Sequence, residues 1–533
     1  MIDSKTLASL TVSNRTDTEY TSVMTLDSCE NIVRQRISTA IDEELKAHPD
    51  TVIRKVFTAV TRQAIEKYIR ESQPLVEGFL EDDGTPQLRK LQENLIHNFT
   101  GYGPIQEAMD SPTVTEIQIN DYDSIFIEEK GKLRRYTRSI KVGSMEQIVP
   151  VSFGSREKYA QWVNRILMED NKKLTEQIAV VDAITANGIR VNVVSDRATV
   201  SDKYGTRKYS PINVTLRKQP EYKFTTEALI QNKTMSTGIA RLLELIPNSK
   251  LSTFVIGATG SGKTVLVNII TDNIPDETRV FAVGNPAELR LRRRDPQTGM
   301  LLNNIIHTQA TTWVGDLKQC PKEFPDTLNL IGAAMRVTPE IAIMEEMRFF
   351  TEFERFSSLA TSGHCVISTF HGKSAKAAID RYLAELQSAN PALTRETICS
   401  TLAGFLKFII VQQKMRDGSR KIKEIAEVTG ATVDDVGNKT LKLNYLYKFI
   451  QDKPTEEDAA SKKDANYLKR PVKGSHYRVG CISEDAEEAF LAAGFTEDDY
   501  GFLTKPLEVD ENGKPIPEKD IYEFNPILNF LSV

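Results

Sequence analysis

The sequence is poor in cysteine, in tryptophan and in long hydrophobic runs. Its 533 residues include 5 cysteines and 2 tryptophans, and no two cysteines form a Cys-x-x-Cys pair. We therefore expect neither a disulfide framework nor a cysteine-based zinc site, and a reducing compartment fits best. No run of about 18 consecutive apolar residues occurs, so no membrane-spanning helix is expected. The N-terminus also lacks the basic and apolar regions of a signal peptide.

An excess of positive charge is missing as well. The net charge is −5 and the isoelectric point is near 5.9, so nothing in the balance calls for nucleic acid as a partner. The sequence also contains no recognisable nucleic-acid recognition module. Hydrophobic residues make up 40% and charged residues 26%, which is typical of globular proteins. A chain of this length exceeds one ordinary core, so several domains are expected.

The first two regions differ in the period of their apolar residues. Within residues 1–100, after a disordered start, apolar side chains recur at helical spacing, as at Val52, Val56 and Val60. This pattern predicts a helical domain with a structural or adaptor role. In residues 101–225 short runs such as "TEIQIND" alternate instead, which predicts strands within a mixed α+β domain.

The third region, residues 226–450, alternates strand-like and helix-like segments. This order is typical of a parallel α/β domain. The last region, residues 451–533, begins with a charged linker up to about residue 475 and ends in a small segment. In that segment "EEAFLAAGF" predicts a helix. The fold class is therefore a multidomain α/β protein.

A phosphate-binding loop lies inside "STFVIGATGSGKTVLVNII", which reads as strand, glycine-rich turn and helix. The turn matches G-x-x-x-x-G-K-[ST], in which glycines let backbone N–H groups converge on phosphate at a helix N-terminus. Lys263 should reach the β- and γ-phosphates, and the Thr264 hydroxyl should hold Mg²⁺. The alternative, a chance glycine turn, is disfavoured by the matching strand and helix. The predicted binding residues are Gly257, Ala258, Thr259, Gly260, Ser261, Gly262, Lys263 and Thr264.

Hydrolysis also requires a carboxylate near the metal ion. In "RVTPEIAIMEEMR" the run "IAIM" predicts a short strand, with Glu345 and Glu346 at its carboxyl end. Ligands bind at that edge of parallel sheets, which favours a functional role. The alternative is an ordinary solvated acidic pair.

Two histidines flank the strand-like run "CVIST", namely His364 and His371. They could serve as metal ligands, as catalytic groups or as hydrogen-bonding sensors of the phosphate. Their spacing is not that of a zinc motif, and no third ligand accompanies them. A structural role for each therefore remains open.

Taken in order, these motifs resemble the secretion ATPase superfamily, the hexameric motors of type IV pili and of type II and type IV secretion. The resemblance covers about residues 100–430. Within the superfamily the sequence is most similar to assembly (extension) ATPases of type IVb pili, such as the bundle-forming pilus ATPase. The resemblance implies a RecA-like P-loop core that uses ATP and Mg²⁺. It implies no zinc, because the two Cys-x-x-Cys pairs of many relatives are missing.

The resemblance assigns roles to the acidic pair and to the histidines. "TPEIAIMEEMR" is similar to the family's Walker B segment, which places the catalytic glutamate at Glu346 and puts Glu345 where the family usually has glycine. Glu346 and Thr264 would together form the Mg²⁺ site, with the ion held through the nucleotide and water. "TSGHCVISTFHGKSA" resembles the family's His box, which implies that His364 and His371 both lie near the phosphates.

Two arginines gain a role in the same way. "NGIRVNVV" and "NVTLRKQP" resemble the two arginine-bearing strands of the family's second N-terminal domain. Arg190 and Arg217 are then candidate arginine fingers, because guanidinium groups near the γ-phosphate neutralise charge in the transition state.

One motif departs from the family pattern. The family's Asp box usually reads Ile-Glu-Asp-Pro followed by Glu, whereas this chain has "AVGNPAEL". Gly284 and Asn285 replace the paired acids, which leaves Glu288 as the remaining acid of the box. Hydrolysis could therefore be slow or depend on assembly.

The function implied by the resemblance is an ATP-hydrolysing homohexameric motor that powers type IV pilus assembly. It would be cytoplasmic and peripherally associated with the bacterial inner membrane, through a platform protein and other pilus assembly proteins alone. One alternative is a conjugation motor, or a type II or type IV secretion motor of the same superfamily. Another is a nucleotide-gated scaffold with little hydrolysis. A retraction motor and a nucleic-acid motor are disfavoured, by the region before residue 100 and by the charge balance.

Overall fold

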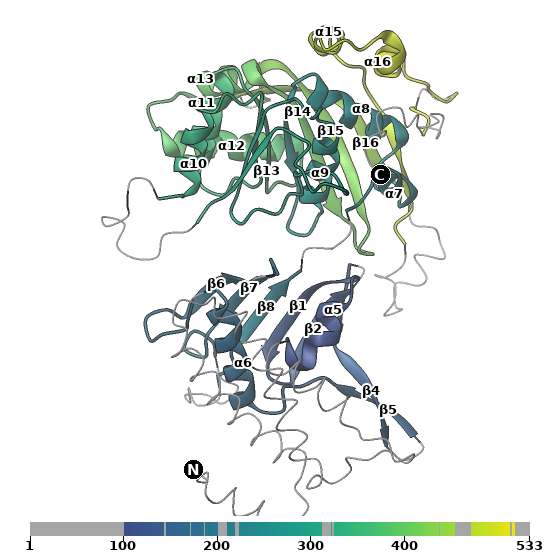
Figure 1. Ribbon diagram of the computed structural model, residues 1–533. Coiled ribbons are helices and arrows are strands. Elements are labelled where there is room, and N and C mark those ends of the chain that lie inside the picture. Colours follow the sequence, from purple (N-terminus) through teal and green to yellow (C-terminus); the bar gives the residue numbers. More distant parts are fainter. Residues whose placement is uncertain are drawn as a thin grey trace, which may run out of the picture. The chain divides into compact units, whose positions relative to one another are not determined.

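The computed structural model divides the chain into two units, Met1–Glu221 and Tyr222–Val533 (Figure 1). The predicted helical domain over residues 1–100 lies outside the residues that the structure describes. The described residues are 101–129, 131–142, 145–170, 172–185, 187–200, 210–218, 223–311, 321, 324–435, 437–453, 471–511 and 514–517.

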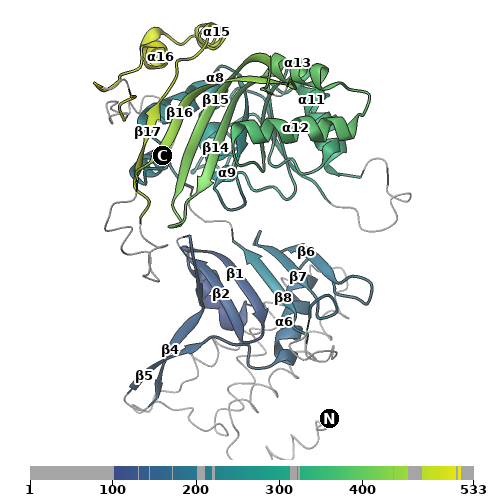
Figure 2. The ribbon, with the colours of Figure 1, turned by 180° about the vertical axis from the view of Figure 1, so that it is seen from behind.

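The first unit is built on a six-stranded antiparallel sheet in the order β3-β2-β1-β8-β7-β6 (Figure 2). Its strands are β1 (Val114–Asp121), β2 (Ser124–Glu129), β3 (Lys132–Arg135), β6 (Val180–Ile184), β7 (Arg190–Val194) and β8 (Asn213–Arg217). Ile117 lies opposite Ile127, and both are buried. Successive side chains of a strand point to opposite faces, so the predicted alternation is confirmed here.

Helix α6 (Arg156–Met168) supplies the core of this unit with two large aromatic side chains. It begins at its cap Ser155, whose hydroxyl accepts the backbone N–H of Lys158. Tyr159 and Trp162 of α6 are buried against the sheet. The remaining elements among the described residues of this unit are the 3₁₀ turn η2 (Gly103–Ile105), α5 (Gln106–Asp110) and the hairpin of β4 (Thr137–Val142) and β5 (Met145–Pro150).

The second unit holds a nine-stranded sheet in the order β11-β10-β12-β13-β9-β14-β15-β16-β17. The strands from β11 to β14 are parallel, and those from β14 onward pair antiparallel. The strands are β9 (Ser252–Ile256), β10 (Val280–Gly284), β11 (Ile305–Gln309), β12 (Ile341–Met344), β13 (Cys365–Phe370), β14 (Leu406–Lys414), β15 (Arg420–Val433), β16 (Lys439–Gln451) and β17 (Gly474–Arg478).

Helices cover both faces of this sheet (Figure 1). One face carries α7 (Thr226–Gln231), α8 (Thr237–Asn248) and α9 (Lys263–Asp272). The other carries α10 (Thr327–Ala334), α11 (Phe350–Thr361), α12 (Ala375–Ala389) and α13 (Arg395–Phe405). Burial on both faces explains why β9, β12 and β13 consist almost entirely of buried residues.

The C-terminal segment belongs to the second unit rather than following it as a separate piece. The predicted linker over 451–475 is too long at both ends, because Gln451 ends β16 and Gly474 begins β17, paired with it. Helices α15 (Glu484–Ala492) and α16 (Glu497–Thr504) pack on the core beside α8. Asp499 of α16 accepts Arg241 Nη2 at 2.6 Å. Most of the predicted linker, residues 454–470, lies outside the residues that the structure describes.

The described helices are short. The longest of them, α12, has 15 residues. In this part of the chain no helix has the length and hydrophobicity that crossing a membrane requires.

Candidate functional site

The phosphate loop joins β9 to α9 as the sequence predicted. Gly262 precedes α9 with a φ of 95°, a left-handed conformation that favours glycine. A Cβ at Gly257 would overlap the backbone carbonyl oxygen of Gln412 and the Ser261 hydroxyl. Both glycines are therefore required by the backbone path, and the loop ends at the N-terminus of a helix, where anions bind.

Lys263, the first residue of α9, points back into the loop. Its Nζ donates to the carbonyl oxygens of Gly257 at 3.1 Å and Ala258 at 3.3 Å, and the residue is 9% exposed. Burial lowers the pKa of Lys263, while the nearby carboxylates of Glu346 and Glu288 oppose that change. The site thus holds a desolvated cation, faced by two acids, where the motif expects phosphate.

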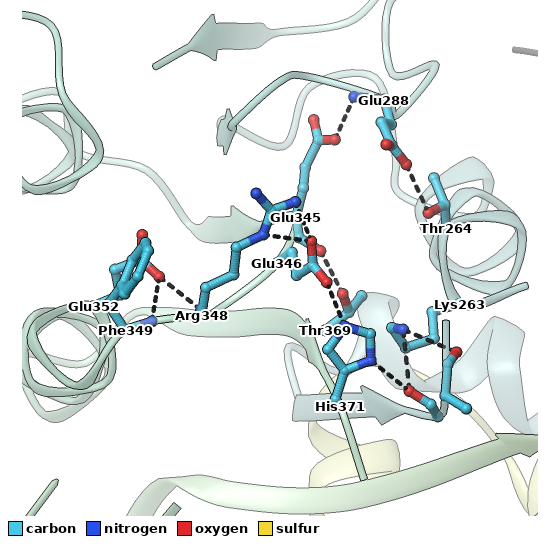
Figure 3. Close-up of polar contacts among 12 residues, drawn as sticks. Lys263, Thr264, Glu288, Glu345, Glu346, Arg348, Phe349, Glu352, Thr369 and His371 are labelled. Carbon is cyan, nitrogen blue, oxygen red and sulfur yellow. Dashed lines mark hydrogen bonds and ion pairs between the residues drawn. The ribbon is translucent and has the colours of Figure 1, made fainter. Parts of the chain in front are cut away.

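Glu346 lies beside this lysine at the carboxyl edge of the sheet (Figure 3). It accepts Arg348 Nε at 2.8 Å, and its Oε1 lies 3.0 Å from Nε2 of His371. The other ring nitrogen of His371, Nδ1, lies 3.2 Å from the carbonyl oxygen of Gly257. Burial alone would raise the pKa of Glu346, but Arg348, Lys263 and His371 together hold it below its usual value. Glu346 is therefore ionised at neutral pH.

The chain on either side of Glu346 is fixed from two directions. Thr369 of β13 donates its hydroxyl to the backbone carbonyl oxygen of Glu345 at 2.5 Å. Glu352, in the first turn of α11, accepts the backbone N–H groups of Arg348 at 2.7 Å and Phe349 at 3.0 Å. Burial raises the pKa of Glu352, and those two N–H groups oppose the rise. The Glu346 carboxylate is thus presented by a rigid turn.

A second acid at the phosphate loop, Glu288, comes from the segment after β10. The Thr264 hydroxyl donates to Glu288 Oε2 at 3.2 Å (Figure 3). Mg²⁺ prefers oxygen ligands and usually takes one or two from the protein and the rest from phosphate and water. The Thr264 hydroxyl and the Glu288 carboxylate are two oxygen donors of this kind at the phosphate loop.

His364 does not lie at this site, contrary to what the resemblance implied. It precedes β13, and its Nδ1 lies 3.0 Å from the Ser362 hydroxyl and 3.2 Å from the carbonyl oxygen of Leu359. His371 follows the same strand, and parallel strands advance about 3.3 Å per residue, so the two histidines are about 20 Å apart. Histidines at opposite edges of a sheet cannot share a metal ion or both approach one phosphate.

The two predicted arginine fingers lie side by side in the first unit. Arg190 of β7 and Arg217 of β8 are direct cross-strand partners. Arg217 Nε donates to Glu116 Oε2 at 3.0 Å, and the Arg217 side chain is 47% exposed. The two arginines thus occupy directly opposite positions on neighbouring strands of the sheet. Their action on a phosphate stays a prediction.

Sequence reasoning missed a pair at this edge, the buried Glu345 and the partly buried His307. Glu345 Oε1 lies 2.8 Å from Nε2 of His307, and Oε2 accepts the backbone N–H groups of Glu288 and Leu289. His307 lies on β11, in a run that matches no motif. Only the pairing of β10 with both β11 and β12 brings it toward the acidic pair.

The chain belongs to a known family. Residues 98–457 match the family model described as "Type II/IV secretion system protein", which is more than half of the chain. This membership agrees with the fold and with the site at the carboxyl edge of the sheet.

Individual relatives are distant. One is the uncharacterized protein MJ0900 of Methanocaldococcus jannaschii, 28% identical over 248 residues, which are 44% of this chain and 40% of that protein. Another is the type IV secretion system protein VirB11 of Bartonella henselae, 25% identical over 41% of this chain and 57% of that protein. The chain thus spans about half the length of these curated relatives. Among solved structures, the Legionella pneumophila ATPase DotB is 18% identical, covers 75% of this chain and 94% of its own, and has a TM-score of 0.37.

Proposed function

We propose that the second unit binds and hydrolyses ATP with Mg²⁺, and that the chain is a hexameric motor for type IV pilus assembly. The observation that carries the ATPase proposal is one convergence of groups. Lys263, Thr264, Glu288, Glu346 and His371 come from four separate segments and meet at the carboxyl edge of one parallel sheet. Ligands bind at this edge in open α/β sheets.

Each side chain has a task that follows from its contacts. Lys263 neutralises charge on the β- and γ-phosphates, since its buried ammonium gains more from an anion than from loop carbonyls. Thr264 and Glu288 would hold Mg²⁺, which supplies positive charge to the phosphate oxygens. Glu346 Oε accepts a hydrogen bond from the attacking water and takes its proton, because its pKa is held low enough to keep it ionised.

The orientation of Glu346 depends on its partners. Arg348 holds one oxygen through two nitrogens, at 2.8 Å and 2.5 Å. His371 lies between Glu346 and the carbonyl oxygen of Gly257, so it links the acid to the phosphate loop. Movement of the phosphate loop would therefore change the position of the Glu346 carboxylate.

The position of Glu288 favours hydrolysis over a purely structural use of ATP. The altered Asp box, with Gly284 and Asn285, was the support for a nucleotide-gated scaffold. Glu288 nevertheless lies 3.2 Å from the Thr264 hydroxyl, so the box still brings an acid to the phosphate loop.

The motor function is proposed from family membership together with the arginine pair. In this proposal six subunits form a ring at the cytoplasmic face of the inner membrane and act on a platform protein and other pilus assembly proteins. Arg190 and Arg217 would act as arginine fingers, supported by their adjacent positions on β7 and β8. Rotation of the first unit about the chain that leads into α7 would move them to or from the γ-phosphate, because α7 itself packs on the core of the second unit. The second candidate is a type IV secretion motor, favoured by the names of relatives such as VirB11 and PtlH.

Steady-state ATPase activity tests the enzyme proposal. The wild type should turn over as a hexamer, and Glu346→Gln should lower kcat by about a hundredfold, since it removes the ionised oxygen that positions water. Glu340→Gln is the matched control, because Glu340 borders the other end of the same strand. Equal turnover of wild type and Glu346→Gln, even with the platform partner added, would leave ATP as a structural switch. A deletion strain scored for surface fibres and for DNA or protein transfer separates pilus assembly from secretion.

A further inference from the structure

Glu345 is a buried carboxylate that the proposed mechanism does not use. It is 8% exposed, and it turns toward the segment after β10 while its neighbour Glu346 turns toward the phosphate loop (Figure 3). Both of its oxygens are engaged. Oε1 lies 2.8 Å from His307 Nε2, and Oε2 accepts the backbone N–H groups of Glu288 at 2.5 Å and Leu289 at 3.1 Å. A buried carboxylate is costly unless its oxygens are satisfied, and here they are.

The segment after β10 leaves room for this carboxylate. A Cβ added at Gly284 would lie 2.5 Å from Cα of Ala287 and 2.6 Å from Cδ of Glu345, so any larger side chain would displace both. The next N–H group along the segment, that of Arg290, donates to Asn268 Oδ1 of α9 at 2.9 Å. Three consecutive backbone N–H groups, at residues 288, 289 and 290, are therefore fixed by side chains of the ATPase core.

The residue whose backbone is held is also the one that reaches the phosphate loop. Glu345 fixes the N–H of Glu288, and the carboxylate of Glu288 accepts the Thr264 hydroxyl at 3.2 Å. We propose that Glu345 is a positioning residue: by accepting the Glu288 and Leu289 N–H groups it places the Glu288 carboxylate at Thr264. This proposal rests on the proposed function, in which that corner binds Mg²⁺ and ATP.

Positioning of this kind depends on the length of the side chain and on its acceptor oxygen, not on its charge. Glutamine has the same length as glutamate, its carbonyl oxygen can accept both N–H groups, and its amide can donate to the neutral form of His307. Aspartate keeps the charge but is one methylene shorter, so it cannot reach. The Gln variant therefore separates positioning from catalysis at Glu345.

The test compares Glu345→Gln with Glu345→Asp in the full-length protein. We expect kcat to stay within about threefold of wild type for Gln and to fall at least about tenfold for Asp, since small displacements of a catalytic group cost that much. KM should change little for Gln and rise by about tenfold for Asp, because binding of the Mg²⁺-bound nucleotide is weakened in that variant. Glu340→Gln and Glu340→Asp are the matched controls, because the Glu340 carboxylate also accepts a backbone N–H, that of Arg279, at 3.2 Å.

A second readout needs no turnover. The affinity for a fluorescent ATP analogue is measured with Mg²⁺ and with EDTA. For Glu345→Asp the Mg²⁺-dependent gain in affinity should fall by about tenfold, while the affinity in EDTA stays within about twofold of wild type. Thermal unfolding of each variant establishes that it folds.

The outcomes are distinct. The positioning role is overturned if Glu345→Asp behaves as wild type in both readouts, or if Glu345→Gln is as impaired as Glu345→Asp. The latter result would make the charge of Glu345 part of the chemistry. If wild type does not hydrolyse ATP but the Mg²⁺ pattern holds, the ATPase proposal fails and the positioning role stands.

Discussion

The two edges of the parallel sheet carry the same three residue types in different surroundings. Each edge has a lysine, a glutamate and a histidine in the segments next to strands β9, β12 and β13. The carboxyl edge has Lys263, Glu346 and His371, and the amino edge has Lys250, Glu340 and His364.

Burial and backbone geometry separate the two sets. At the amino edge Lys250 Nζ pairs with Glu340 Oε2 at 2.5 Å, but the side chains are 53% and 42% exposed. The hydrogen bond from Lys250 lowers the pKa of Glu340, and water screens such a pair. At the carboxyl edge Lys263 is 9% exposed inside a loop of close-packed glycines. The same residue types therefore differ in chemical role because the loop after β9 buries the lysine at the carboxyl edge.

The largest expected effect comes from replacing each of the two lysines by alanine. Lys263→Ala should lower ATPase kcat/KM by at least about a thousandfold, because a buried cation facing the phosphates is lost. Lys250→Ala should leave it within about twofold, since its exposed pair is worth little. Steady-state kinetics on both purified variants checks this. A comparable loss in the two variants would mean that the edges do not differ in function.

The two histidines form a second pair of tests, with a smaller effect. His371→Ala removes the link between Glu346 and the carbonyl oxygen of Gly257, and kcat should fall about tenfold to a hundredfold. His364→Ala removes contacts with Ser362 and Leu359 alone, and kcat should change less than about twofold. Both are read from kcat at saturating ATP. Loss of activity in His364→Ala, with its melting temperature unchanged, would return that residue to the site.

The sequence predicted those parts of the site that depend on local pattern. Strand, loop and helix around Lys263 follow from glycine spacing, and the strand before Glu345 follows from a short apolar run. The pair of Glu345 and His307 could not be predicted, because it depends on the order of β10, β11 and β12 in the sheet. The resemblance placed His364 with His371, and only the direction of β13 separates them.

The same limit applies to the C-terminal end of the second unit. Charge and the scarcity of large apolar residues predicted a linker up to about residue 475. Residues 454–470 lie outside the described part of the chain, and β17, which begins at Gly474, extends the sheet next to β16. This end of the unit is held to the sheet by polar contacts between residues that are far apart in sequence. Glu427 of β15 is fully buried, accepts the Ser483 N–H at 2.9 Å and pairs with Lys407 at 3.1 Å. No local pattern encodes such a contact.

A third histidine is buried at the lateral edge of the sheet and has no catalytic role in the proposed mechanism. His476 of β17 is 7% exposed, and its Nε2 donates to the carbonyl oxygen of Ile422 at 3.0 Å. Burial lowers the pKa of His476 from 6.5 to about 4, the Ile422 carbonyl oxygen opposes that change, and Lys421 adds to the lowering. The folded protein therefore keeps this ring neutral at a pH where the unfolded chain protonates it.

The lowered pKa of His476 makes the stability of the folded protein depend on pH. Between about pH 4 and pH 6.5 the unfolded state binds more protons at His476, so stability rises with pH across this window and is lost as pH falls through it. The full shift corresponds to about 3 kcal/mol. Hydrogen–deuterium exchange of peptides from β16 and β17, corrected for intrinsic rates, should show less protection at pH 5 than at pH 7. His476→Gln should remove most of this difference, because glutamine can donate to Ile422 without titrating. An unchanged difference in His476→Gln would assign the acid sensitivity to another group.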